Sequence, residues 1–215
     1  MMSLNTVDPQ IAKLIEEEKR RQEKTLMMIP SENYASPAVL VALGSVTQNK
    51  YAEGYPGRRY YQGNEIIDQI ENLAQKRAQR LFGVPHVNVQ PYSGSPANSA
   101  VYFALLEPQD KIMGLSLNSG GHLTHGHPKI TFSGRYFQSI RYEVGEDGLL
   151  DYERIEKQAE AEKPKIIVVG TTAYPRILDF KRFGQIADKV GAYLLADIAH
   201  IAGLVAAGVH PSSVT

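Results

Sequence analysis

Three histidines fall within six residues, at His122, His125 and His127, in a glycine-rich segment. Such a density of imidazoles suggests either a metal site or a ring held over a planar ligand. Gly126 and Pro128 would break any helix that aligned the imidazoles, and no nearby carboxylate completes a ligand set. We therefore expect no metal here. An imidazole over a planar ligand and a loop of mobile histidines remain as alternatives.

A second segment, Ser93-Gly94-Ser95-Pro96, has the composition of a helix start. Ser95 fits the N-cap and Pro96 the first helical position, so a well-formed cap explains these residues. An anion cradle explains them equally well, because Gly94 admits close backbone approach and free N–H groups attract negative charge. The chain contains neither G-x-x-x-x-G-K-[ST] nor G-x-G-x-x-G, so nucleotide loops of those kinds are unsupported.

Asp197 ends an apolar stretch, where a carboxylate is costly to bury unless it is partnered. It either caps the following turn or stays ionised to pair with a cationic ligand atom.

A fourth segment, residues 50–63, holds four of the twelve tyrosines. Neither helical nor strand periodicity explains that density, which is typical of a functional loop or a subunit interface.

Alternating strands and helices must position these segments. Helical spacing predicts helices over residues 9–24, 64–82, from 96 onward, about 151–163, and up to Gly191. Short apolar runs predict strands over 87–90, 111–117, 138–144, 165–170 and 192–196. This alternation predicts an α/β fold, a mostly parallel sheet with helices on both faces. Ligands of such sheets gather beyond the carboxyl ends of the strands, where these segments lie.

Composition limits the function further. The 215 residues contain no cysteine, which excludes disulfides, thiolate catalysis and cysteine-ligated metals. Lys+Arg and Asp+Glu number 23 each, so no net charge favours nucleic acid or an anionic membrane. The first thirty residues lack the apolar core of a signal peptide. We expect a cytoplasmic protein that binds neither nucleic acid nor membrane.

The chain resembles the serine hydroxymethyltransferases, which are fold-type-I pyridoxal-phosphate enzymes. The resemblance runs end to end and rests on seven motifs in order: Pro30-Ser31-Glu32-Asn33-Tyr34, residues 49–57, Arg59-Tyr60-Tyr61, Ser93-Gly94-Ser95, residues 120–126, Ala173-Tyr174-Pro175-Arg176 and residues 199–208. It implies that residues 64–215 are part of the cofactor-binding large domain, incomplete at its C-terminus. Residues 1–63 are then an N-terminal arm and a tyrosine-rich active-site and dimer segment.

The resemblance also implies roles for single residues around pyridoxal 5'-phosphate. Ser93, Gly94 and Ser95 would hold its phosphate. Asp197 would pair with the pyridine nitrogen and keep it protonated, so that the ring can act as an electron sink. His122 would stack on the ring, and Thr172 and His200 would contact the side of its phenolic oxygen. Tyr51 would reach the phosphate of a neighbouring subunit, in a homodimer or a dimer of dimers.

Substrate roles follow from the same resemblance. Glu53 would be the acid/base at the hydroxymethyl group of serine, with Tyr60 and Tyr61 beside it, and Ser31 would touch the amino acid. Leu117, Gly121, His122 and Leu123 would border tetrahydrofolate, the one-carbon acceptor. The residues with catalytic roles would be Glu53, Tyr61, His122 and His200. The implied reaction interconverts serine and glycine.

Some positions depart from the family pattern. Tyr92, Gln62, Asn64 and the pair Thr171-Thr172 replace its commoner residues. The lysine that binds the cofactor covalently in the family would follow His210-Pro211, beyond Thr215. We therefore expect the N-terminal portion of the enzyme, inactive alone. The alternatives are a non-catalytic remnant that binds phosphate or pairs with a full-length subunit, and an aldolase of β-hydroxy amino acids.

Overall fold

The computed structural model describes residues 3–214, and the chain divides after Ala35 into two compact units. The first contains helices α1 (Leu4–Val7) and α2 (Pro9–Lys24). Helix α2 begins where the Asp8 side chain accepts a hydrogen bond from the backbone N–H of Ile11 (3.0 Å), with Pro9 at its first position. The predicted helix over 9–24 is confirmed, and its apolar residues are exposed.

The second unit begins with α3 (Pro37–Leu43), η1 (Val46–Asn49) and the antiparallel pair β1 (Gly54–Tyr55) and β2 (Arg58–Arg59). Helix α4 (Glu65–Phe82) follows and ends at Gly83, whose φ of 67° suits glycine. The prediction of this helix is confirmed. Asn64 occupies its N-cap position, but the Asn64 side chain donates to the carbonyl of Tyr61 and makes no capping bond.

Four parallel strands form the central sheet, in the order β4-β3-β5-β6. Their bounds are Lys111–Leu115 for β3, Gln138–Tyr142 for β4, Ile166–Gly170 for β5 and Tyr193–Asp197 for β6. The parallel sheet is therefore confirmed. Strand β3 is shorter than predicted because the chain after Leu115 turns into η2 (Leu117–Ser119).

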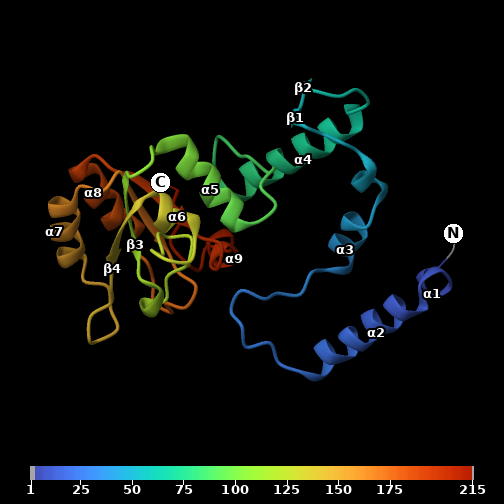
Figure 1. Cartoon of the computed structure of the whole chain (residues 1–215), viewed down its shortest axis with the longest axis horizontal. Helices are drawn as coiled ribbons and strands as arrows, with labels where there is room; N and C mark the ends of the chain where they lie inside the picture. The colour runs from blue at the N-terminus through green and yellow to red at the C-terminus, as the bar shows by residue number, and fades with distance from the viewer. Residues whose placement is uncertain (1–2, 215) are drawn as a thin grey trace. The chain divides into compact units, whose positions relative to one another are not determined.

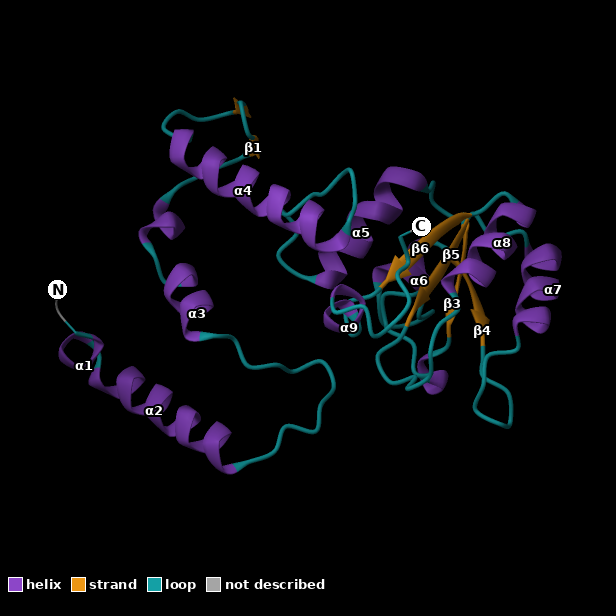
Figure 2. Cartoon of the chain, turned by 180° about the vertical axis from the view of Figure 1, so that it is seen from behind, coloured by secondary structure: helices purple, strands orange, loops and turns teal. Residues whose placement is uncertain are grey.

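Helices cover both faces of this sheet (Figure 2). Successive side chains of β5 point to opposite faces of the sheet and so belong to two cores. In the first core, Ile167 and Val169 pack with α7 (Tyr152–Glu162) and α8 (Phe180–Val190). Ile166 and Val168 point the other way, toward the cluster that contains α5 (Gly94–Leu105) and α6 (Phe132–Tyr136). Because both faces are buried, β5 is apolar throughout, as its sequence predicted. Burial of each such side chain contributes about 1.5–3 kcal/mol to the free energy of folding.

Two predictions at the start of α5 are wrong. Residues 87–90 form no strand, because a side chain takes up a backbone group that a strand would use for pairing. The Asn88 side chain accepts a hydrogen bond from the Gln90 backbone N–H at 2.9 Å. Helix α5 begins at Gly94, two residues before Pro96, and its N-cap is Ser93 and not Ser95. Proline is tolerated there because first-turn N–H groups have no partner within the helix.

A short helix, α9 (Ala202–Ala206), follows β6. Figures 1 and 2 both place β1 and β2 beside the N-terminal end of α4, and α5 beside its C-terminal end. None of the helices within residues 3–214 is long and apolar enough to cross a membrane.

Candidate active site

Asp197 lies at the carboxyl end of β6 and is the centre of a buried polar cluster. Its Oδ2 accepts hydrogen bonds from Asn98 Nδ2 and from His125 Nε2, both at 2.9 Å. Its Oδ1 accepts from the backbone N–H of Ala199 (3.2 Å), so the residue also caps the turn after the strand. Burial raises the pKa of Asp197, but the hydrogen bonds from His125 and Asn98 lower it by more, and the net pKa lies well below the usual range. The carboxylate is ionised at neutral pH.

His125 is the residue of this cluster to which the sequence assigned no role of its own. Its side chain is 1% exposed, and its Nδ1 is buried without a partner among the described residues. Space for it comes from Gly114 in β3, where a Cβ would lie 3.1 Å from the His125 Cβ and would overlap the His125 carbonyl oxygen. The sequence did contain a signal, because His125 lies near the end of the motif 120–126 and Asp197 lies at the end of a predicted strand. Their spacing in the sequence does not show that the two side chains meet.

His122 is held by its neighbour Thr124. The Thr124 backbone N–H lies 3.2 Å from His122 Nδ1, and the Thr124 hydroxyl lies 2.8 Å from the same nitrogen. Asn98 Nδ2 donates to that hydroxyl oxygen at 2.9 Å, which leaves the hydroxyl hydrogen free for His122. Nδ1 is therefore an acceptor, and the ring proton is on Nε2. Burial lowers the pKa of His122, and the nearby His125 and His200 lower it further, whereas the Asp197 carboxylate raises it; the net pKa is lowered, which favours the neutral ring.

The loop after β5 places Thr172 beside the segment that carries His122. The backbone N–H groups of Thr172 and Ala173 donate to the carbonyl of Gly120, at 2.7 and 3.1 Å. This contact joins the loop to the segment that carries His122. The Thr172 Oγ1 is buried, and it has no hydrogen-bond partner within residues 3–214. An unpaired buried hydroxyl is unfavourable unless a ligand or water satisfies it.

The N-terminus of α5 borders this group. Asn98, which binds Asp197, lies one helical turn after Gly94, so Ser93, Gly94 and Ser95 lie within about one to one and a half turns of the residue that contacts the carboxylate. All three residues are exposed. A Cβ on Gly94 would meet no other atom of residues 3–214 within 4 Å, so the space beside its backbone is open among these residues. The unpaired N–H groups of a twelve-residue helix make this end favourable for an anion.

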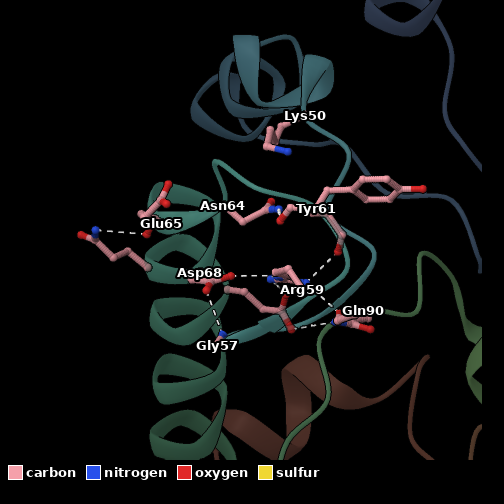
Figure 3. A network of polar contacts seen from close by, with 12 residues as sticks. Lys50, Gly57, Arg59, Tyr61, Asn64, Glu65, Asp68 and Gln90 are labelled. Carbon is pink, nitrogen blue, oxygen red and sulfur yellow. Dashed lines mark hydrogen bonds and ion pairs between the residues drawn. The ribbon is translucent and has the colours of Figure 1, made fainter.

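The tyrosine-rich segment, which contains β1 and β2, lies beside the N-terminal end of α4 (Figure 1). Helix α5, which carries the Asp197 partner Asn98, lies beside the C-terminal end of α4. Glu53, Tyr51, Tyr60 and Tyr61 are exposed in the tyrosine-rich segment. The rings of Tyr51 and Tyr61 are in edge contact, with centroids 5.3 Å apart. Figure 3 shows the contacts that hold this segment against α4. The structure thus brings together the predicted residues of the sheet, and leaves those of the tyrosine-rich segment separate within one chain.

The remaining predicted residues lie in three places. Leu117 and Leu123 flank the glycines after β3, exposed and half-buried respectively. Gly121 is buried, and a Cβ there would run into the carbonyl oxygen of Leu115, so packing alone requires glycine. Ser31 is exposed in the first compact unit. His200 is half-buried after β6. Within residues 3–214 no group of three or more His, Cys, Asp or Glu could hold a metal ion.

The parallel sheet and the carboxylate at the end of β6 place the chain in a class, the fold-type-I pyridoxal-phosphate-dependent transferases. Residues 4–215 match the family model described as serine hydroxymethyltransferase, and the chain belongs to that family.

Curated relatives agree with this assignment. The chain is 58% identical over 212 residues to the serine hydroxymethyltransferase of Desulfotalea psychrophila, covering 99% of this chain and 50% of that protein. It is 59% identical over 215 residues to that of Sorangium cellulosum, covering 100% of this chain and 51% of the relative. Serine hydroxymethyltransferase 1 of Pseudomonas fluorescens is 56% identical over 214 residues, with 99% and 52% covered. The chain spans about half the length of these relatives.

Proposed function

We propose that the protein containing this chain interconverts serine and glycine with pyridoxal 5'-phosphate, and transfers the hydroxymethyl carbon to tetrahydrofolate. The observation that carries the proposal is the ionised Asp197 carboxylate, held by His125 and by Asn98, and Asn98 lies about one helical turn from Ser93-Gly94-Ser95. This arrangement offers one fixed negative charge and, beside it, one anion site. Family membership supports the reaction assigned to it.

The residues present fit this cofactor. The open space at Gly94 and the free N–H groups of α5 suit a phosphate group. The Oγ1 of Thr172, which has no hydrogen-bond partner among the residues that the structure describes, offers a buried hydroxyl to a polar ring substituent. When bound, pyridoxal phosphate supplies an electron sink for a carbanion.

Each residue of the proposed cofactor site then has a physical task. Asp197 holds a proton on the pyridine nitrogen, since an ionised carboxylate favours the protonated partner. Ser93 and Ser95 donate to phosphate oxygens together with the backbone at Gly94. His122, neutral and half-buried, covers one ring face without adding positive charge. Thr172 and His200 orient the ring from the side of its phenolic oxygen.

Substrate chemistry is assigned to the tyrosine-rich segment. Glu53 moves a proton at the hydroxymethyl oxygen of serine, beside Tyr60 and Tyr61. Because this segment is separate from Asp197 within one chain and its tyrosines are exposed, we infer that a second copy completes the site in a homodimer. Tyr51 then contacts the phosphate bound by its neighbour. Ser31 contacts the amino acid, and Leu117, Gly121 and Leu123 border the folate.

The test is glycine formation from serine and tetrahydrofolate by the full-length protein that contains this chain. Asp197→Asn and Glu53→Gln should each reduce kcat by about 100-fold or more. Glu146→Gln, at an exposed loop carboxylate, is the matched control and should leave kcat unchanged. No glycine formation by the unaltered protein, with retained cofactor binding, would instead support the non-catalytic alternative. Full activity of Asp197→Asn would overturn the assigned mechanism.

A further inference from the structure

The guanidinium of Arg59 is buried between the tyrosine-rich segment and α4 (Figure 3). Its side chain is 4% exposed. On the α4 side, Nε donates to Asp68 Oδ1 at 2.8 Å and Nη2 donates to Glu71 Oε2 at 2.7 Å. On the loop side, Nη1 donates to the carbonyls of Ala52 and Gly54, both at 2.7 Å. One planar group therefore binds two carboxylates and two backbone carbonyls.

The two carbonyls belong to the residues on either side of Glu53. The Glu53 carbonyl itself accepts from the backbone N–H of Tyr60 at 3.2 Å. The turn between β1 and β2 is also bonded to α4, since the Gly57 N–H donates to Asp68 Oδ2 at 2.9 Å. Thus the backbone that carries Glu53 is fixed on both sides, while its side chain remains exposed.

Gln90 extends these contacts toward α5. Its Nε2 donates to the Gly54 carbonyl and to Glu71 Oε1, both at 2.9 Å. Gln90 lies three residues before Ser93, the N-cap of α5. The loop with Glu53 and the segment leading to the anion site are therefore attached to one and the same side chain of α4, that of Glu71.

We propose that Arg59 is a positioning residue that sets the location of the Glu53 carboxylate, and that Gln90 supports it. The proposal rests on the proposed function, which gives Glu53 its role. Lysine cannot replace arginine here, because an ammonium group lacks the planar fork that reaches acceptors in several directions. A displacement of about 1 Å in a reacting group can reduce turnover by about 100-fold.

The first test needs no activity. Amide hydrogen exchange of Gly57 and Tyr60 is measured in the full-length protein, in Arg59→Lys and in the control Arg58→Lys, whose arginine is exposed. Arg59→Lys should speed exchange at these two amides by about 10-fold or more and leave Ile186 in the buried part of α8 unchanged. Unchanged exchange at Gly57 and Tyr60 would overturn the proposal.

The second test is a double-mutant cycle on glycine formation. Arg59→Lys should lower kcat by about 10–100-fold, with KM for serine within about twofold. In a Glu53→Gln background the same substitution should have little further effect, because the two residues act through one group. Additive losses would contradict positioning of Glu53. If Arg59→Lys does not fold, Gln90→Met, at an exposed position, should give a smaller loss with the same non-additivity.

These two tests separate failure of this inference from failure of the proposed function. Absence of glycine formation by the unaltered protein refutes the function and leaves the exchange result to decide on Arg59. An active protein whose Arg59→Lys variant retains full kcat refutes the inference alone.

Discussion

His125 Nε2 lies 2.9 Å from Asp197 Oδ2, joining two side chains that are 72 residues apart in the chain. The imidazole comes from the loop after β3, and the carboxylate comes from the end of β6. Strand β5 separates these two strands in the sheet. The pair therefore spans the carboxyl edge of the sheet and stabilises the ionised form of Asp197.

His125→Ala should lower the stability of the protein at neutral pH and so bring acid unfolding to a higher pH. The folded-state pKa of Asp197 is depressed, so its stabilising contribution is present above the unfolded pKa of about 4 and is lost as pH falls through the folded value. Removing the His125 donor raises the folded pKa. We expect about 1.5–3 kcal/mol less unfolding free energy at pH 7 and an acid midpoint at higher pH, from urea unfolding between pH 3 and 7.

The control for this experiment is His86→Ala, at an exposed position, which should leave both quantities unchanged. An acid midpoint of His125→Ala equal to that of the unaltered protein would show that Asp197 does not depend on this hydrogen bond.

Gly114→Ala should be destabilising although alanine is small. A Cβ at residue 114 would overlap the carbonyl oxygen of His125, and backbone cannot yield as a flexible side chain can. We expect a loss of about 1–3 kcal/mol in chemical unfolding. Gly184→Ala is the matched control, since a Cβ there in α8 meets nothing within 4 Å. It should stabilise the helix by up to about 1 kcal/mol, and equal losses at both sites would refute the packing argument.

Thr124→Val should change the tautomer of His122 as well as stability. Valine keeps the shape but removes the hydroxyl that lies between Asn98 Nδ2 and His122 Nδ1. We expect a loss of about 1–3 kcal/mol and a larger Nδ1-protonated fraction in imidazole ¹⁵N spectra. Thr124→Ser, which retains the hydroxyl, should restore the spectrum. Identical spectra for all three proteins would mean that the backbone N–H alone sets the tautomer.

Thr172→Val distinguishes a ligand contact from a structural one. The Thr172 Oγ1 is buried and has no partner in the described part of the chain, so replacing it with a methyl group should leave the unfolding free energy of the cofactor-free protein unchanged or raise it. The affinity for pyridoxal phosphate, followed by its absorbance, should fall about tenfold for one lost hydrogen bond. Reduced stability with unchanged affinity would assign the hydroxyl a structural role.

Several elements could be predicted because their signals are local. Helix α4 follows from apolar spacing and ends at Gly83, and β5 follows from a run of β-branched residues. The alternation of strands and helices was sufficient for a parallel sheet with both faces covered. Residues 87–90 were predicted wrongly because the Asn88 side chain binds the Gln90 backbone N–H, while the Gln90 side chain binds Gly54 and Glu71, which are distant in sequence.

The candidate site divides in the same way. By itself the sequence determined which residues could do chemistry, because a strand-end aspartate, a glycine between serines and a tyrosine-rich loop are visible as residue types and spacings. Only the tertiary structure decided the partners: His125 on Asp197, Thr124 on His122, and Arg59 on the carbonyls beside Glu53. The physical reason is that a hydrogen bond depends on positions within about 3 Å, and those positions are set by strand order and packing.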